Sequence, residues 1–484
     1  MFSRPPRSPR SFTSCTRLLA ATWLLAAPVA VRAQAGAQEG DSVQLSLGDA
    51  VTRALRESDE ARLAAVQLDL ADAQITTARA AGLPQARLAG SYSQVLRNAR
   101  AEIVGSIFGQ NFNYSSNINV SQTLFQGGRV LAGARAASDV RGAARLNIAE
   151  ARAQISVDVQ RAYLQALLSR ELEDIQARNI ELAQARITLV EQLQSAGRAS
   201  RYDVLRARVE RANLEPNLLQ ARAGRELAAI ELRRILNIPE GRPIALTSEI
   251  DTAALRATVR AIANDASPDP VRPAERAAQF TVDARREGIR IARADLLPTI
   301  STFFQTGYTA LPSNNGFPTV WGNTSNGNCP PGSPETRVCQ NNGWFPDRTF
   351  GVQVAWPLFD GLRAKGNIDL AQAQERVARL QLAQERERVA VERARARAEY
   401  ARAEAAFEAQ RQNAVEADEA FRIASLRFER GLATQLEVSD AQLLLLTART
   451  NAARATIDYY LAAAELARAR GVDVPLPPTR PATR

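Results

Sequence analysis

A six-residue motif occurs twice in this chain and constrains its fold more than any other feature. Leu124–Arg129 reads LFQGGR, and Leu358–Arg363 reads LFDGLR 234 residues later. Each copy follows a short run of alternating apolar and polar residues, the pattern of a strand with two unlike faces. Each copy precedes a long run rich in Ala, Arg, Gln, Glu and Leu, a composition that favours helix. The motif therefore predicts a strand that turns at glycine into a helix, and its recurrence predicts an internal duplication.

The helical runs after the motif are longer than a globular core requires. No proline occurs from 126 to about 195 or from 360 to about 429, and roughly 70 helical residues span on the order of 100 Å. Apolar residues recur every three or four positions, which predicts coiled-coil-like packing against neighbouring helices. The runs end at Gly197 and Gly431, again 234 residues apart, and Ser or Thr follows as the N-cap of a returning helix. Each repeat is therefore expected to contain a helical hairpin.

A second repeated landmark marks the change from helix to strand. Pro84 ends a helical pattern that starts near residue 45, and Pro298 ends one that starts near residue 273, because the residue before a proline disfavours helical geometry. A hairpin with a polar loop is expected between each proline and the motif that follows. The second hairpin is longer by about twenty residues, as exposed loop tips tolerate.

The first residues have the pattern of a secretory signal peptide. A basic segment precedes an apolar core from 18 to 31, and Val31-Arg32-Ala33 offers a cleavage site. The alternative, a transmembrane anchor, needs about 20 apolar residues, and this run is shorter. No later stretch is apolar and long enough to span a bilayer as a helix, so a membrane-embedded form would span by strands.

The composition removes most classes of enzyme and metal site. The sequence contains no histidine, which excludes Ser/His/Asp and Cys/His catalysis and His-based zinc sites. We expect no catalytic, cofactor-binding or metal site. The net charge of +10 includes five arginines of the expected signal peptide, so the mature chain would carry about +5. Arg and Glu alternate along the helical runs, which favours ion-paired helix faces over nucleic-acid binding. Cys329 and Cys339 lie in the longer hairpin loop and are expected to form a disulfide in an exported protein.

These patterns predict a mainly α fold with a small β part. The expected segments are a signal peptide (1–33), a first repeat (34–238, hairpin at about 85–124, tip at 195–200), a linker (239–272), a second repeat (273–470, hairpin at about 299–358, tip at 429–434) and an irregular Pro-rich tail (471–484). Four strands cannot close a membrane barrel alone. Three copies would supply twelve strands, which the long helices would continue as an α-helical barrel.

In their order and spacing, these motifs resemble the TolC-like outer membrane efflux proteins. The resemblance covers nearly the whole mature chain, from the LSLxxA pattern at Leu45 through both Leu-Pro pairs, both LFxG turns and both glycine tips. It implies a homotrimer with a twelve-stranded outer membrane barrel and a periplasmic helical tunnel in a Gram-negative bacterium. The implied function is passive export of small molecules or polypeptides in tripartite efflux or type I secretion. The implied partners are a periplasmic adaptor (membrane fusion) protein, an inner-membrane pump and outer membrane lipid, with no nucleic acid.

The resemblance also implies site residues at the tips. Acidic residues narrow the periplasmic end in that family, and the matching positions are Glu437 and Asp440, with Asp203 the first-repeat counterpart of Glu437. In a trimer each would form a ring of like charge that favours cations; ordinary solvated surface acids are the alternative. Gly197-Arg198 and Gly431-Leu432 would form the adaptor-docking surface. The expected strand–helix turn residues are Gly127, Gly128, Gly361, Pro84 and Pro298.

The chain departs from the family where similar proteins latch the closed end with a tyrosine and an arginine. Phe428 and Ala433 occupy those positions, and Arg198, Arg201 and Arg430 are the candidate substitutes. A competing function is a structural coiled-coil envelope protein anchored in the outer membrane without transport. Small polar residues expected on the strands favour a hydrated lumen, and hence a channel; these are Ser91, Ser93, Asn119, Ser121 and Gln353.

Overall fold

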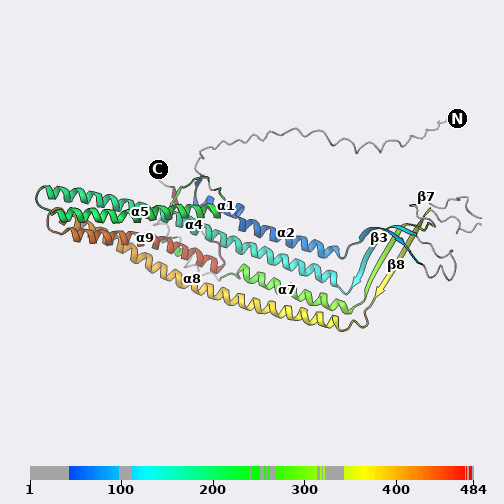
Figure 1. Ribbon diagram of the computed structural model, residues 1–484. Coiled ribbons are helices and arrows are strands. Elements are labelled where there is room, and N and C mark those ends of the chain that lie inside the picture. The colour runs from blue at the N-terminus through cyan, green and yellow to red at the C-terminus, as the bar shows by residue number, and fades with distance from the viewer. Residues whose placement is uncertain are drawn as a thin grey trace, which may run out of the picture.

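The molecule is elongated, with a β-sheet at one end and helical hairpins at the other (Figure 1). The computed structural model describes residues 43–97, 112–239, 241–250, 256–257, 259–261, 269–312, 317–318, 320–321, 343–474, 476 and 479–481. The expected signal peptide (1–33) and disulfide (Cys329, Cys339) lie outside these residues. No helix in the described part of the chain is long and apolar enough to cross a membrane.

Two helices of 67 residues, α4 (Arg129–Ser195) and α8 (Arg363–Glu429), run from the sheet to the tips. Shorter helices complete the wall around them: α2 (Asp59–Ala80) and α7 (Pro273–Arg293) near the sheet, and α5 (Arg201–Ile235) and α9 (Gln435–Arg470) near the tips. The order across the wall is α2-α4-α7-α8 near the sheet and α5-α4-α9-α8 near the tips. The wall is therefore one layer of helices with two open edges.

The sequence predicted one helix from about residue 45 to Leu83, but the structure has two, so the prediction was wrong around Ser58. α1 spans Leu47–Glu57 and α2 begins at Asp59. Between them Ser58 has extended backbone geometry (φ −65°, ψ 149°), and its hydroxyl accepts a hydrogen bond from the N–H of Ala61 at 3.2 Å. A serine N-cap followed by acidic residues ends one helix and starts another without proline or glycine.

Five strands form the sheet in the order β2-β3-β6-β8-β7: β2 (Gln85–Gln94), β3 (Phe112–Gln126), β6 (Thr299–Ala310), β8 (Gly343–Ala355) and β7 (Val320–Trp321). The first four are antiparallel, and β3 of the first repeat pairs with β6 of the second. The register joins Gln85 to Ser121, Ser121 to Phe303, and Phe303 to Gly351. The two repeats therefore share one continuous sheet.

The sheet has one mainly polar and one mainly apolar face, because register partners lie on the same side. The polar face carries all five small polar residues that the sequence suggested for a lumen: Ser91, Ser93, Asn119, Ser121 and Gln353. The opposite face carries Leu88, Ile118, Val120, Phe304, Phe350 and Val352. Much of this apolar face is open to solvent in the single chain, with Leu88 76% and Phe350 72% exposed.

The strand–helix turns use left-handed backbone geometry at equivalent positions of the two repeats. In the first, Gly127 and Gly128 have φ of +57° and +78°; in the second, Gly361 and Leu362 have φ of +69° and +71°. Leu362 therefore adopts a conformation that favours glycine.

The two prolines lie where helix gives way to strand. Pro84 lies between the turn after α2 and the first residue of β2. Pro298 follows the 3-10 turn η2 (Ala294–Leu296) and precedes β6. Leu297, before the second proline, is extended (ψ 155°), as the proline requires.

The largest core lies midway along the helices, where α1, α4 and α9 meet two small sheets. β1 (Val43–Leu45) pairs with β4 (Ile244–Leu246), and β5 (Ser248–Ile250) pairs with β9 (Thr479–Pro481). The buried Tyr163 hydroxyl donates to the carbonyl of Leu45 at 2.9 Å and accepts from the N–H of Ser248 at 3.3 Å. The tail predicted to be irregular thus contains a strand. Three-residue strands give no readable alternation, so pairing with distant segments decides them.

Candidate functional site

The tips are the turns that join α4 to α5 and α8 to α9, and they lie together at the end of the molecule farthest from the sheet (Figure 1). Gly197 and Gly431 have φ of +70° and +74°. After Gly197, the N–H of Arg198 donates to the carbonyl of Leu193 at 2.8 Å; after Gly431, the N–H of Leu432 donates to the carbonyl of Arg427 at 2.8 Å. This is the Schellman arrangement, which satisfies the last carbonyls of each long helix.

The two tips touch one another through Arg198. A β-carbon built on Gly431 would lie 3.1 Å from Nη2 of Arg198, so this guanidinium lies across the second tip. Leu432 is 66% exposed beside it. Of the three arginines suggested as latch substitutes, Arg198 is thus placed between the tips, whereas Arg430 is the C-cap of α8 and Arg201 is the first residue of α5.

Two of the three proposed gate acids form capping boxes at the return helices. Ser200 accepts from the N–H of Asp203 at 3.2 Å, and its own N–H donates to that carboxylate at 2.9 Å. Thr434 accepts from the N–H of Glu437 at 3.3 Å, and its N–H donates to the carboxylate at 3.1 Å. Each carboxylate therefore satisfies the backbone at the start of its own helix.

The capping bonds stabilise the charged form of these acids. The hydroxyl and N–H of Ser200 lower the pKa of Asp203 below its usual value. The N–H and hydroxyl of Thr434, with a smaller contribution from Arg427, lower the pKa of Glu437. Asp440 lies one turn after Glu437 on α9 and is exposed. All three acids are on the tip half of the return helices, and no group of three or more acidic or cysteine side chains converges into a metal-binding cluster among the described residues.

A partly buried polar contact that the sequence did not reveal joins the two hairpins a few turns above the tips. Arg186 of α4 donates to the hydroxyl of Ser439 on α9 at 2.8 Å and to the carboxylate of Glu210 on α5 at 3.3 Å. The Ser439 hydroxyl donates to the same carboxylate at 2.9 Å. We call these three residues the hairpin bridge. The Arg186 side chain is only 9% exposed, and burial lowers its pKa, which Glu210 partly offsets.

A second polar contact lies further from the tips. Gln442 of α9 donates to the backbone carbonyl of Asn179 on α4 at 3.3 Å and also to its side-chain oxygen, and both residues are buried. In the sequence, these residues look like ordinary members of solvated helix faces. Only the crossing of α4 against α9 brings them into the interface.

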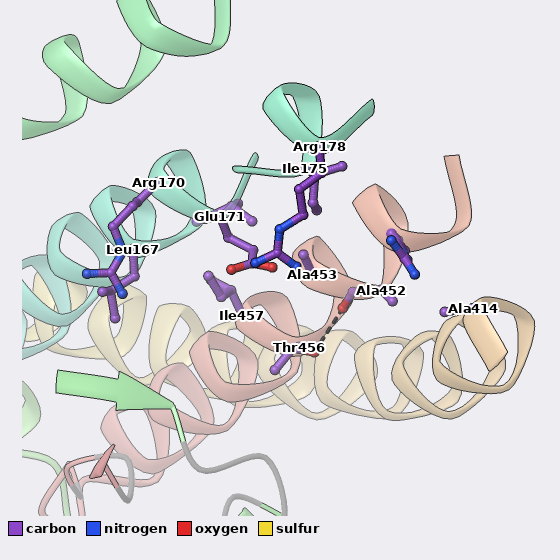
Figure 2. Close-up of a pocket in the computed structure, with 12 residues that line it drawn as sticks. Leu167, Arg170, Glu171, Ile175, Arg178, Ala414, Ala452, Ala453, Thr456 and Ile457 are labelled. Carbon is purple, nitrogen blue, oxygen red and sulfur yellow. Dashed lines mark hydrogen bonds between the residues drawn. The ribbon is translucent and has the colours of Figure 1, made fainter. Parts of the chain in front are cut away.

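A groove of about 560 Å³ lies between the two hairpins, above the hairpin bridge. Its floor is apolar, with Leu167, Ala453 and Ile457, and its rim carries charge. In Figure 2, Glu171 and Arg178 point toward one another over this floor. A second groove, which shares Arg178, continues from it along α4, α8 and α9 toward the tips. The surface between the hairpins is therefore long, shallow and mixed in character.

These features define a class of protein: a duplicated, strand-based sheet continued by long helical hairpins. The chain belongs to the outer membrane efflux protein family, whose sequence model matches residues 50–237 and 271–472. The matched segments leave out most of the linker between the repeats. The family places the chain in the outer membrane of a Gram-negative bacterium, with the helical part in the periplasm.

Particular relatives are more distant. The chain is 23% identical over 331 residues to the cobalt-zinc-cadmium resistance protein CzcC of Cupriavidus metallidurans, covering 67% of this chain and 69% of that protein. Among solved structures, the outer membrane protein VceC of Vibrio cholerae has a TM-score of 0.67 at 22% identity, covering 89% of this chain and 97% of VceC. CusC has a TM-score of 0.69 at 17% identity, covering 89% and 93%.

The comparisons confirm the predicted family and fold class. The open-state MtrE outer membrane channel of Neisseria gonorrhoeae also shares the fold, with a TM-score of 0.63 at 20% identity, covering 88% of this chain and 89% of MtrE. At these identities, the solved structures establish the fold, and they assign no role to individual tip residues. The gate, docking and latch assignments therefore stay predictions.

Proposed function

We propose that three copies of this chain form the passive exit channel of a tripartite export system. Its partners supply the energy for export, and the residues that the structure describes contain no cluster of three or more acidic or cysteine side chains that could hold a metal ion. Membership in the outer membrane efflux protein family supports the export role. The trimer is our inference from the shape of the single chain.

The observation that carries the proposal is that the sheet and the helical wall are open along the same two edges. β2, α2 and α5 form one edge, and α8 and β8, of which only Gly343 and Trp344 pair with β7, form the other. Both edges carry apolar side chains exposed at helical spacing, such as Tyr202, Leu205 and Val209 on α5 and Val377 and Leu380 on α8. Further copies would cover these stripes and pair the open strands. Three copies of the four long strands give twelve, a closed cyclic solution.

The two faces of the sheet suit the two environments of such a channel, lipid on the outside and water in the lumen. The apolar face, with Leu88, Phe304 and Phe350, would contact outer membrane lipid, and the polar face, with Ser91 and Asn119, would line a hydrated lumen. A structural envelope protein without transport has no need for a polar lumen, so this alternation favours the channel.

The tips are proposed as the surface that a periplasmic adaptor contacts, with an inner-membrane pump behind it. Gly197, Arg198, Gly431 and Leu432 lie together at the exposed end, and the groove between the hairpins extends this surface. Crosslinking from Arg198 in cells tests the adaptor assignment, and failure to capture an adaptor contradicts it. Choice of cargo is assigned to the pump.

Asp203, Glu437 and Asp440 are proposed to set the charge of the periplasmic opening. Threefold symmetry would turn each exposed carboxylate into a ring, and the lowered pKa of Asp203 and Glu437 keeps those two rings charged. Replacing Glu437 and Asp440 together by glutamine removes charge while an amide at 437 can still accept the capping bonds. Unchanged conductance and cation selectivity in planar bilayers would show that these acids serve the helix ends alone.

Conductance also tests the function as a whole. Reconstituted protein should form discrete conducting units in a planar bilayer, and adaptor and pump should co-purify with the solubilised complex. A folded, membrane-inserted protein that never conducts would favour the structural envelope role.

A further inference from the structure

One charged side chain lies on the mainly apolar face of the sheet. Arg348 of β8 is in register with Thr306 of β6, which is in register with Ile118 of β3, and register partners share a face. Among the described residues of β2, β3, β6 and β8, Arg348 is the single charged residue on this face. It is exposed, and its side chain forms no hydrogen bond or ion pair with another described residue. An arginine without a described partner therefore lies on the face that is proposed to contact lipid.

The position of Arg348 is unfavourable for a charge that has no ligand. Its neighbours on the same face of β8 are Pro346 and Phe350, and Phe350 is 72% exposed. A charged residue on the lipid side of a barrel destabilises the protein unless the charge is paired or reaches the membrane interface. An ionisable side chain in such a position therefore indicates a binding site, and a cation there requires an anionic ligand.

Two hydroxyl groups lie beside Arg348 on the same face. Thr306 is directly opposite it, and Tyr308, which is 41% exposed, follows on β6 opposite Pro346. Diagonal neighbours such as Tyr308 and Arg348 lie about 7–8 Å apart, within reach of long side chains. A guanidinium offers parallel N–H donors that match two oxygens of a phosphate, and hydroxyls can donate to the third. The donor set thus suits a phosphate group.

A cluster of aromatic rings lies between this donor set and the end of the sheet. Trp321 lies 4.7 Å from Tyr308 and 6.0 Å from Trp344, and Phe317 lies 5.8 Å from Trp344, measured between ring centroids. Trp321 and Phe317 are 67% and 68% exposed. Trp344 is four residues from Arg348, about 13 Å along the strand, and a long arginine side chain can extend toward the membrane interface. Exposed rings with polar edges suit that interface and can cover the apolar faces of sugar rings.

The ligand is limited by where this end of the sheet lies. The cluster is at the end farthest from the long helices (Figure 1), and the helical part lies in the periplasm. In the proposed channel this end of the sheet lies in the outer leaflet of the outer membrane. The main lipid of that leaflet is a glycolipid with phosphate groups on its sugars. Phosphate and sugar are the two chemical groups that the arginine and the exposed rings suit.

We propose that Arg348, with Thr306 and Tyr308, binds a phosphate of an outer-leaflet phosphoglycolipid, and that Trp321 and Phe317 cover its sugar. Charge complementarity selects an anionic lipid, and the exposed rings select a glycolipid over a glycerophospholipid. The inference rests on the proposed membrane channel and adds a lipid-binding site on its outer surface.

Titration of the delipidated full-length protein with diphosphorylated lipid A tests the site. The protein is held in an uncharged sugar detergent, and binding is followed by tryptophan fluorescence. Arg348→Gln should weaken binding about tenfold or more, because it removes charge-assisted hydrogen bonds. Arg87→Gln is the matched control, because Arg87 is opposite Asn119 on the polar face, and its affinity should equal that of the native protein. Equal affinity of the native protein and Arg348→Gln overturns the proposal.

Two further lipids test the two parts of the ligand. Dephosphorylated lipid A should bind the native protein and Arg348→Gln with the same low affinity. Phosphatidylglycerol should bind the native protein more weakly than lipid A does. Replacing Trp321 and Phe317 together by alanine should weaken lipid A binding about threefold or more and leave phosphatidylglycerol binding unchanged. If phosphatidylglycerol binds the native protein as tightly as lipid A, the choice of a glycolipid is wrong.

Thermal unfolding separates a ligand site from a structural role of Arg348. Without lipid, Arg348→Gln should unfold at the same temperature as the native protein or at a higher one, because it removes an unpaired charge from an apolar face. Lipid A should then raise the unfolding temperature of the native protein and of Arg87→Gln, but not that of Arg348→Gln. Destabilisation of Arg348→Gln already in lipid-free detergent would show that the arginine supports the fold, and would overturn the proposal.

Conductance separates this inference from the proposed function. If the native protein conducts but its lipid A binding does not depend on Arg348, the site is wrong and the channel stands. If binding depends on Arg348 but the protein never conducts, the channel is wrong and the site stands. Absence of both refutes both.

Discussion

Alanine at Gly127 and at Gly361, in separate variants, should destabilise the protein to different extents. The two glycines occupy the same position of the two repeats and have similar φ, +57° and +69°. A β-carbon at Gly127 would lie 2.9 Å from Cα of Ala294 and 3.0 Å from its carbonyl oxygen, whereas nothing lies within 4 Å of a β-carbon at Gly361. Each variant therefore controls for the other.

The expected losses of stability follow from two contributions, the left-handed backbone geometry and the contact with Ala294. Left-handed geometry costs an L-residue about 1–2 kcal/mol at either position. The contact with the Ala294 backbone adds a further cost at Gly127, and shifts forced on packed regions typically cost about 1–3 kcal/mol. Alanine also restricts the unfolded chain at both positions, which offsets about 0.4–1 kcal/mol. We therefore expect Gly361→Ala to lower the free energy of unfolding by about 1 kcal/mol and Gly127→Ala to lower it by about 1.5–4 kcal/mol.

Urea unfolding of the detergent-solubilised protein, followed by tryptophan fluorescence, measures the difference. The indole N–H of Trp356 donates to the carbonyl of Leu296 at 3.2 Å, two residues from Ala294, so the fluorescence reports on the affected junction. Equal midpoints for the two variants would refute the steric argument, since only the backbone strain would remain.

Three further predictions concern the second turn and the tips. Leu362→Gly should raise the free energy of unfolding by about 0.5–1 kcal/mol, because glycine adopts a φ of +71° without strain and the leucine side chain that is lost is 67% exposed. A lower urea midpoint would contradict this. The capping box at the start of α9 should persist above pH 4.5, the ordinary pKa of a glutamate, and weaken only as the pH falls below it, because capping lowers the pKa of Glu437 in the folded state. Circular dichroism measured against pH checks this, with Glu437→Gln as the control that does not titrate. Loss of helix already above pH 4.5 would oppose it. Arg186→Ala should separate the two hairpins at the tips and increase single-channel conductance, because it removes charged hydrogen bonds worth about 1.5–3 kcal/mol. Ser439→Ala leaves Arg186 bound to Glu210 and should therefore change the conductance less. Equal effects of the two variants would argue against the hairpin bridge.

Local signals in the sequence located the turns and tips well. Gly127, Gly197, Gly361 and Gly431 all adopt the left-handed geometry that their positions suggested. Glycine, proline and N-cap residues act through their immediate neighbours, so a one-dimensional pattern is enough to find them. The break at Ser58 was missed because one serine cap gives a weaker signal than proline.

The tip site was only partly readable. Position in the sequence suggested Asp203 and Glu437 as gate acids, which stays a prediction, but it did not reveal that each carboxylate closes a capping box. The hairpin bridge was invisible, because Arg186, Glu210 and Ser439 come from three helices and are separated by up to 253 residues. Contacts of this kind depend on which helix faces cross.

The sequence by itself determined the duplication, the long helices, the alternating strands and the turns between them. Each follows from residue spacing and local backbone preference. Tertiary structure decided that β3 pairs with β6 across the repeats, that Thr479–Pro481 pairs with Ser248–Ile250, and that β7 pairs with Gly343 and Trp344 at the start of β8. Register and strand pairing depend on segments far apart in the chain, whose relative placement is fixed only when they pack together.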